Sequence, residues 1–482
     1  MSLFEGRTYD DFLFRPQRGI VSSRRGVKLT TPLTRTLRLE LPIVSANMDS
    51  VTSAEMARTM ALEGGIGFVH RGQTIEAEAA DVAAVKRSHG HLVEHPWRLP
   101  RDATLREARD FARHHRVTGI LIEESRGSGV LAGLLSHRDL PWFGGHDDER
   151  VDAYMTPFER LVTAPPDVEP AEAARLLFEN RIEKLPLIDR DRKIRGLVTK
   201  SDLMLARTRP GSSKDAKGRL LVGAAIGARG DFLERAAELL RAGADVLVMD
   251  VAHGHSDVMR EAIEAFRRAF PDAALVAGNV GGADGARFLA DLGADAIKVG
   301  IGPGRGCRTR LETAAGVPQL QAVYETWSAV GDRVPIIADG GVRHDKDLFL
   351  ALACGASTVM LGSMLSGTDE APGTVIEDPA THEKRKLYRG MTSPQAVLNA
   401  LYEATPEEVD DALDVPAEGQ ELEVPYQGSV RDVLHRIRGH LRSAVSYAGE
   451  DALERVRAKV VAAPERYLVP LSAASRRESY ER

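Results

Sequence analysis

The sequence predicts an α/β protein, a (β/α)8 TIM barrel that an inserted pair of repeats interrupts. Three observations lead to this prediction: eight short apolar runs that end in a polar or glycine residue, helix-like segments between them, and two similar halves in the long gap after the second run. A doubly wound open sheet competes, but it would place a GxGxxG turn after its first strand, and the sequence has none there. The eight runs are 42–47, 66–70, 221–225, 246–250, 275–279, 296–300, 336–339 and 358–362.

Polar residues or a cysteine end or follow six of the predicted strands. The C-terminal ends of parallel barrel strands meet at one rim, where barrel enzymes keep their catalytic groups. We therefore expect these side chains to lie together. They are Asn47, His70, Asp250, Asn279, Cys307 and Asp339.

The loop Gly300–Arg310, GIGPGRGCRTR, is the most informative of these segments. It carries four glycines and one of only two cysteines, Cys307, with a hydroxyl at Thr309 two residues on. Glycines let backbone amides approach an anion closely. A thiol beside a phosphate cradle indicates covalent attack on a nucleotide. The alternative is a glycine turn with an incidental thiol.

Composition narrows the class of protein. A net charge of -6 and a hydrophobic content of 43% favour neither nucleic acid nor an anionic membrane surface as a partner. No stretch is long and apolar enough for a membrane span, and the first residues lack the order of a signal peptide. Two cysteines exclude a disulfide framework. We expect a cytoplasmic protein.

The gap after the second run contains the internal repeat. Each copy reads as a helix, two strands and the start of a helix, and each holds a hydroxyl residue three positions before an aspartate: Ser136 with Asp139, and Thr199 with Asp202. This pattern resembles a tandem pair of CBS domains, which bind purine nucleotides such as ATP or GTP through that tetrapeptide. The alternative for each tetrapeptide is a helix N-cap. We place the first part of the barrel at 1–94, the tandem CBS (Bateman) module at 95–206, and the rest of the barrel at 207–482.

The motifs GxGPGxxC, DGG and YRGM, on a barrel split by tandem CBS domains, resemble the inosine monophosphate (IMP) dehydrogenase and guanosine monophosphate (GMP) reductase family. The resemblance implies that Cys307 adds to C2 of a purine nucleotide and forms a thioimidate. It also implies the remaining sites. The substrate, GMP or IMP, would contact Asn47, Arg305, Asp339, Gly341, Gly362, Ser363, Gly390, Met391, Ser393 and Gly419, and the nicotinamide cofactor would face Asp250, Ala252 and Asn279.

The flap between residues 391 and 420 decides which member the chain resembles. A dehydrogenase carries an adjacent arginine-tyrosine pair there to activate water, but Tyr402 follows Leu401 in this chain. A reductase needs no such base, and its loop threonine and flap glutamate match Thr309 and Glu418. The sequence therefore predicts an NADPH-dependent GMP reductase. The alternatives are an NAD-dependent IMP dehydrogenase and, in another class, a non-catalytic nucleotide sensor.

Further expectations come from the same resemblance. A monovalent cation such as K+ would bind at Gly302, Gly304 and Cys307, and the chain would form a homotetramer or homo-octamer. The chain departs from the family pattern at three positions. Arg305 replaces a phosphate-binding serine, Arg71 a lysine, and Val415 an arginine of the reductase flap.

Overall fold

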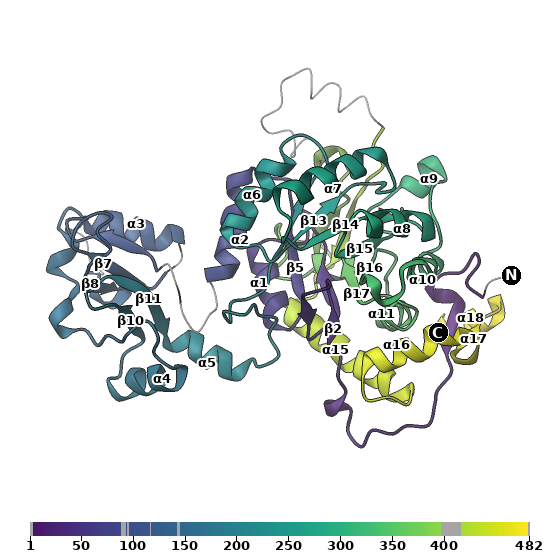
Figure 1. The fold of residues 1–482 in the computed structure, drawn as a ribbon, viewed down its shortest axis with the longest axis horizontal. Helices are drawn as coiled ribbons and strands as arrows, with labels where there is room; N and C mark the ends of the chain where they lie inside the picture. The colour runs from purple at the N-terminus through teal and green to yellow at the C-terminus, as the bar shows by residue number, and fades with distance from the viewer. Residues whose placement is uncertain are drawn as a thin grey trace. The chain divides into compact units, whose positions relative to one another are not determined.

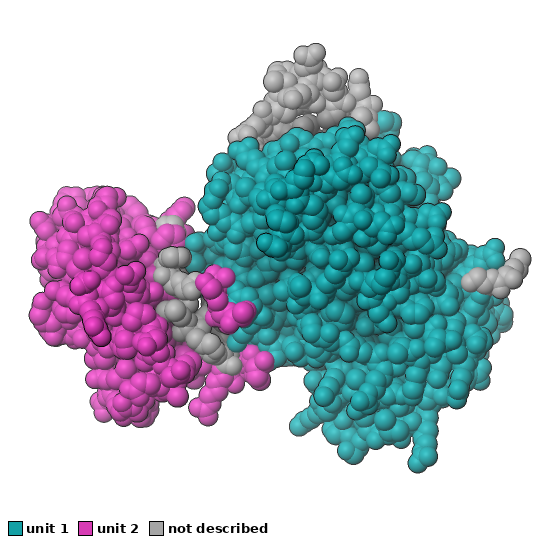
Figure 2. Space-filling model, in the orientation of Figure 1, with its two compact units in different colours: residues 1–88, 211–215, 220–482 teal, residues 89–210, 216–219 magenta. Residues whose placement is uncertain are grey.

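The chain divides into two compact units (Figure 2). Unit 1 comprises residues 1–88, 211–215 and 220–482, and unit 2 comprises residues 89–210 and 216–219. The structure, a computed structural model, describes residues 3–87, 93, 96–115, 117–141, 145–396 and 416–480.

Unit 1 is a closed barrel of eight parallel strands (Figure 1), which confirms the predicted fold. Every predicted run contributes one strand. The strands are almost wholly buried, so they appear in the sequence as continuous apolar runs. The insertion falls between β5 and β12, which pair directly, so the ring stays closed. In ring order the eight barrel strands are β4 (Ile43–Ser45), β5 (Ile66–Val69), β12 (Gly223–Ile226), β13 (Val246–Asp250), β14 (Leu275–Val280), β15 (Ala296–Val299), β16 (Ile336–Asp339) and β17 (Thr358–Leu361).

Helices surround the barrel and bury their apolar sides against it. Two begin at serine caps: Ser256 Oγ accepts the Met259 N–H at 3.4 Å, and Ser429 Oγ accepts the Arg431 N–H at 3.2 Å. Glu370 adds a second acceptor at the latter helix by taking the Val430 N–H at 2.7 Å. The helices are α1 (Ala54–Leu62), α2 (Ile75–Arg87), α6 (Phe232–Ala242), α7 (Asp257–Ala269), α8 (Ala283–Asp291), α10 (Gln319–Val330), α11 (Asp345–Ala353) and α15 (Val430–Tyr447).

Smaller elements complete unit 1. The two ends of the chain are joined by an antiparallel pair, β1 (Phe12–Phe14) with β21 (Leu468–Pro470). A three-stranded sheet carries the segment that leads to the rim, with β18 (Ile376–Glu377), β19 (Lys384–Arg389) and β20 (Glu421–Pro425). The others are β2 (Thr31–Pro32), β3 (Arg38–Leu39), α9 (Thr309–Thr313), α12 (Ser363–Ser366), α16 (Leu453–Ala462), α17 (Pro464–Tyr467) and α18 (Ala473–Tyr480).

Unit 2 contains two small sheets, one in each half of the repeat. A cluster around Leu121, Leu131 and Leu197 packs residues of both halves together. The first half holds β6 (Arg98–Pro100), α3 (Leu105–His115), β7 (Gly119–Glu123), β8 (Leu131–Ser136) and β9 (Thr156–Pro157). The second holds α4 (Pro170–Glu179), β10 (Lys184–Ile188), β11 (Ile194–Thr199) and α5 (Lys200–Thr208).

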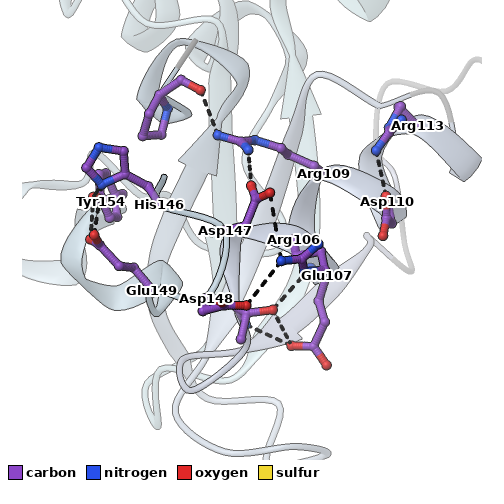
Figure 3. Close-up of polar contacts among 12 residues, drawn as sticks. Arg106, Glu107, Arg109, Asp110, Arg113, His146, Asp147, Asp148, Glu149 and Tyr154 are labelled. Atoms are coloured by element: carbon purple, nitrogen blue, oxygen red, sulfur yellow. Dashed lines mark hydrogen bonds and ion pairs between the residues drawn. The ribbon is translucent and has the colours of Figure 1, made fainter. Parts of the chain in front are cut away.

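Ion pairs tie α3 to the connection that follows β8 (Figure 3). Arg109 pairs with Asp147, and Arg106 pairs with Asp148 at 3.2 Å. The Leu105 N–H also donates to the Glu149 carbonyl at 2.8 Å. Because exposed ion pairs stabilise little, we assign the stability of this half to its apolar core.

Candidate active site

A cavity of about 1010 Å³ lies at the rim where the barrel strands end. It is lined by all of the residues predicted to be catalytic, substrate-binding or cofactor-binding except Ser393 and Gly419. Those two lie behind its wall. Ser393 is fully buried, and a Cβ on Gly419 would come within 2.4 Å of the Ser393 nitrogen. Contact of these two residues with substrate stays a prediction.

Within the cavity, a thiol, a hydroxyl and a carboxylate form a chain. Cys307 Sγ lies 3.1 Å from Thr309 Oγ1, and Thr309 Oγ1 donates to Glu418 Oε2 at 2.5 Å. Thr309 begins α9, whereas Glu418 comes 109 residues later, just before β20. The chain can carry a proton between the carboxylate and an atom held beside Sγ.

Backbone hydrogen bonds dock the Glu418 segment on the cysteine loop. The Arg308 N–H donates to the Glu418 carbonyl at 2.6 Å, and the Gln420 N–H donates to the Gly306 carbonyl at 2.9 Å. The adjoining Gly390 has no room for a side chain, because a Cβ there would lie 2.4 Å from the Gly306 oxygen. Three segments distant in sequence thus meet backbone to backbone around Cys307.

The glycines of the ADGG motif bring a second backbone turn to the same loop. Gly340 and Gly341 have φ values of +85° and +78°, which L side chains rarely adopt. A Cβ on Gly340 would lie 2.9 Å from Pro303 Cγ and 3.1 Å from the Gly304 nitrogen. Backbone amides that approach this closely form the kind of concave surface that binds phosphate.

The central charged group of the site is Lys298, which was not predicted from the sequence. Its Nζ contacts Asp250 Oδ1 at 2.9 Å and Asp339 Oδ2 at 2.7 Å, with the side chain 3% exposed. Asn47 Nδ2 donates to Asp250 at 2.7 Å, and Asn279 Nδ2 donates to Asp339 at 3.0 Å. The signal was a lysine in the middle of an otherwise apolar strand, since a buried charge must be paired.

The charges of this network stabilise one another. Burial alone raises the pKa of the Asp250 carboxyl, but Lys298 and the hydrogen bond from Asn47 outweigh it, so the pKa lies below its ordinary value. Burial alone lowers the pKa of the Lys298 ammonium, but Asp250 and Asp339 outweigh it and raise that pKa. We infer that Asp250 and Lys298 are both ionised at neutral pH.

A bidentate ion pair fixes the YRGM segment. Arg389 donates from Nε to Asp49 Oδ1 at 3.1 Å and from Nη2 to Asp49 Oδ2 at 2.6 Å. The Asp49 side chain is 8% exposed, so the pair is shielded from water. It holds Gly390 and Met391 at the cavity wall.

A model of the IMP dehydrogenase / GMP reductase domain matches residues 6–481. The chain belongs to this family. An inosine-5'-monophosphate dehydrogenase of Nitrosopumilus maritimus is 44% identical over 459 residues, covering 95% of each chain. One of Aquifex aeolicus is 41% identical over 458 residues, covering 94% of this chain and 92% of that protein.

Solved structures of a GMP reductase are similar to this chain. That of Trypanosoma brucei in complex with GMP, a variant with one cysteine replaced by alanine, has a TM-score of 0.89 and 37% identity, covering 98% of this chain and 97% of that one. The same enzyme with GTP has a TM-score of 0.80 and 34% identity, covering 97% and 98%. The chain is thus an oxidoreductase of a family that uses a nicotinamide cofactor.

In unit 2, the structure gives Asp139 a local role. Its Oδ2 accepts the Ser136 N–H at 2.7 Å, the N-cap arrangement that is the alternative to ribose binding. Thr199 ends β11, and the Asp202 side chain lies outside the described residues, as do Tyr402 and Val415. Nucleotide binding by the two tetrapeptides stays a prediction.

Cation binding by the cysteine loop also stays a prediction. The Gly304 carbonyl accepts the Cys307 N–H at 3.0 Å, so one of the three predicted ligand positions already serves the loop itself. Among the described residues, no three His, Cys, Asp or Glu side chains gather as a metal site. In the same part of the chain, no helix is long and apolar enough to cross a membrane.

Proposed function

We propose that the protein is an NADPH-dependent GMP reductase, which converts GMP to IMP and ammonia. The observation that carries the proposal is the hydrogen-bonded chain from Cys307 through Thr309 to Glu418. A dehydrogenase needs a base for water, and the resemblance places it in an arginine-tyrosine pair of the flap. The sequence has no arginine between Arg389 and Arg431.

The proposed reaction assigns one task to each member of the chain. Cys307 Sγ adds to C2 of GMP, and the 2-amino group leaves as ammonia after it accepts a proton. Glu418 holds that proton and Thr309 Oγ1 relays it, which leaves a thioimidate on Cys307. Bound NADPH supplies hydride to C2. The C–S bond then breaks and the thiolate returns, so GMP, NADPH and two protons become IMP, NADP+ and ammonium.

The cavity has groups suited to the nucleotide. Asp339 lies at the rim with a carboxylate for the ribose hydroxyls, and the backbone turn at Gly340 and Gly341 can take the phosphate with Gly362 and Ser363. Met391 and Gly390 would contact the base.

Residues beside Asp250 suit the nicotinamide. Asn279 Oδ1 is buried and accepts no hydrogen bond from any described residue, although its Nδ2 is fully used. An acceptor left without a donor in a polar cavity fits the amide N–H of a nicotinamide. Asp250 and Ala252 line the same wall.

The second candidate function is that of an IMP dehydrogenase. The relatives with similar sequences carry this name, which favours it. Paired assays separate the two. We expect GMP to drive NADPH oxidation with release of ammonia, measured by nicotinamide absorbance and an ammonia assay. NADH formation from IMP and NAD, without reductase activity, would overturn the proposal.

Glu418→Gln tests the proton chain. We expect the substitution to slow ammonia release by about a hundredfold or more, because a glutamine holds no proton for the leaving amine. Hydride transfer to a preformed thioimidate should change less, and single-turnover measurements resolve the two steps. Glu423→Gln, which changes an exposed carboxylate of β20 paired with Arg385, is the matched control. Equal slowing of both steps would reduce Glu418 to a binding residue.

We further propose that unit 2 is a tandem CBS module that binds ATP or GTP and regulates turnover. The double variant Asp139→Asn and Asp202→Asn keeps hydrogen-bond acceptors for capping but removes the carboxylates. We expect calorimetry to show nucleotide affinity at least about tenfold lower, since bonds to a charged acceptor are the stronger ones. Unchanged affinity would leave Asp139 with its cap role alone.

A further inference from the structure

A second cavity, of about 610 Å³, lies beside the active-site cavity in unit 1. Arg305, Arg343, Ser363 and Met364 line both of them. The second cavity is strongly basic. Three arginines and two histidines face one carboxylate: Arg305, Arg343, Arg436, His344, His440 and Asp345.

The charges of this cavity are only partly neutralised. Arg436 Nε contacts Asp345 Oδ2 at 3.2 Å, and His440 Nδ1 contacts the same oxygen at 2.5 Å, so one carboxylate serves both side chains. Arg343 pairs with Asp10, which Lys346 Nζ also contacts at 2.8 Å. Lys346 Nζ also contacts Asp347 Oδ1 at 2.6 Å, so these cations have anionic partners and the excess positive charge of the cavity comes from Arg305.

Arg305 contributes a guanidinium with no such partner. It stands between Gly304 and Gly306 on the cysteine loop and is exposed. The structure records no hydrogen bond or ion pair from its side chain to the residues that it describes. An arginine at this position is unexpected if the only anion nearby is the phosphate of a mononucleotide, because the backbone turn at Gly341 already provides for that group.

We propose that this second cavity binds a phosphate group next to the substrate phosphate. It would be either the terminal phosphate of a purine nucleoside diphosphate in the active site or a free phosphate beside bound GMP. The proposal rests on the proposed function for the position of the first phosphate at Ser363. Because Ser363 lines both cavities, a second phosphate bonded to the first can reach Arg305 and Arg436, whose planar donors suit phosphate oxygens.

Calorimetry on the full-length protein tests the site with three probes: GMP, GDP and inorganic phosphate. We expect Arg436→Ala to weaken GDP binding by about tenfold or more, as one charge-assisted hydrogen bond is lost, with GMP affinity within about twofold. If the source is free phosphate, phosphate should bind the GMP-loaded protein and lose that affinity in Arg436→Ala, with GDP unaffected. Insensitivity of both GDP and phosphate to the substitution would overturn the proposal.

Two further variants make the result specific. Arg436→Lys keeps the charge but loses the forked donors, so its loss should be intermediate. Arg455→Ala removes an exposed arginine of α16 that pairs with Asp451. This variant should change the affinity for neither GDP nor phosphate. Thermal unfolding of each variant checks that the fold is retained. Titrations with IMP and IDP test the phosphate site independently of the proposed GMP reductase activity. If GMP drives no NADPH oxidation, the proposed function fails. The affinities for IMP and IDP still report whether the second phosphate site exists.

Discussion

Replacing Cys307 with alanine is expected to lower turnover by about a thousandfold or more while nucleotide binding persists. The covalent step needs the sulfur, and loss of a nucleophile costs several orders of magnitude. Binding depends on other groups, chiefly the Asp339 carboxylate and the backbone turn at Gly340 and Gly341. Steady-state NADPH oxidation and GMP calorimetry measure the two effects.

Cys354→Ala is the matched control for this experiment. Cys354 is fully buried at the end of α11, and burial raises the pKa of its thiol, so it is a packing residue with no thiolate to offer. The variant should retain turnover. If Cys307→Ala kept turnover within about tenfold of wild type, covalent catalysis through this residue would have to be abandoned.

The barrel was predictable because its strands leave a strong local pattern. A parallel strand covered on both faces is apolar throughout, and each such run in this chain ends where a polar residue turns to the rim. Two glycines of the cysteine loop have a clear structural reason, because a Cβ would lie 2.1 Å from the Asp339 oxygen at Gly300 and 2.9 Å from the Gly390 nitrogen at Gly306. Local pattern thus located the ends of the strands and, with them, most of the cavity wall.

Contacts between distant segments were not predictable from local pattern. Lys298 is surrounded by apolar residues in sequence, and its partner Asp339 lies 41 positions away. The pair of Arg389 with Asp49 spans 340 positions. Ser393 was expected to contact substrate, and its side chain is fully buried and does not line the cavity. A sequence motif predicts which segment reaches a site, but it does not predict which residues of that segment face the cavity.

Lys298→Met is expected to destabilise the protein by about 3 to 5 kcal/mol, the usual cost of removing one member of a buried ion pair. Methionine matches the lysine chain in shape, so the change leaves Asp250 and Asp339 without their cation rather than opening a void. Both carboxylates line the active-site cavity, and Asp339 is the proposed ribose ligand. Turnover should therefore fall along with the midpoint of urea unfolding.

The effect of Lys298→Met on stability should depend on pH. In the wild type the pKa of Asp250 lies below its unfolded value of about 3.9, so its stabilisation is present above that pH and is lost as pH falls through the folded pKa. Without Lys298, burial raises the folded pKa, so the variant loses stability as pH rises through it. The difference between the two proteins should be largest near neutral pH and shrink toward about pH 4.

Lys86→Met is the control that separates stability from positioning. Lys86 is also buried, and its Nζ contacts Asp245 at 2.7 Å and Asp215 at 3.0 Å, neither of which lines the active-site cavity. Its loss should cost comparable free energy of unfolding and leave GMP affinity and kcat unchanged at a temperature where both variants are folded. If Lys298→Met behaved in the same way, the lysine would serve the barrel alone, and the orientation of Asp250 and Asp339 would not depend on it.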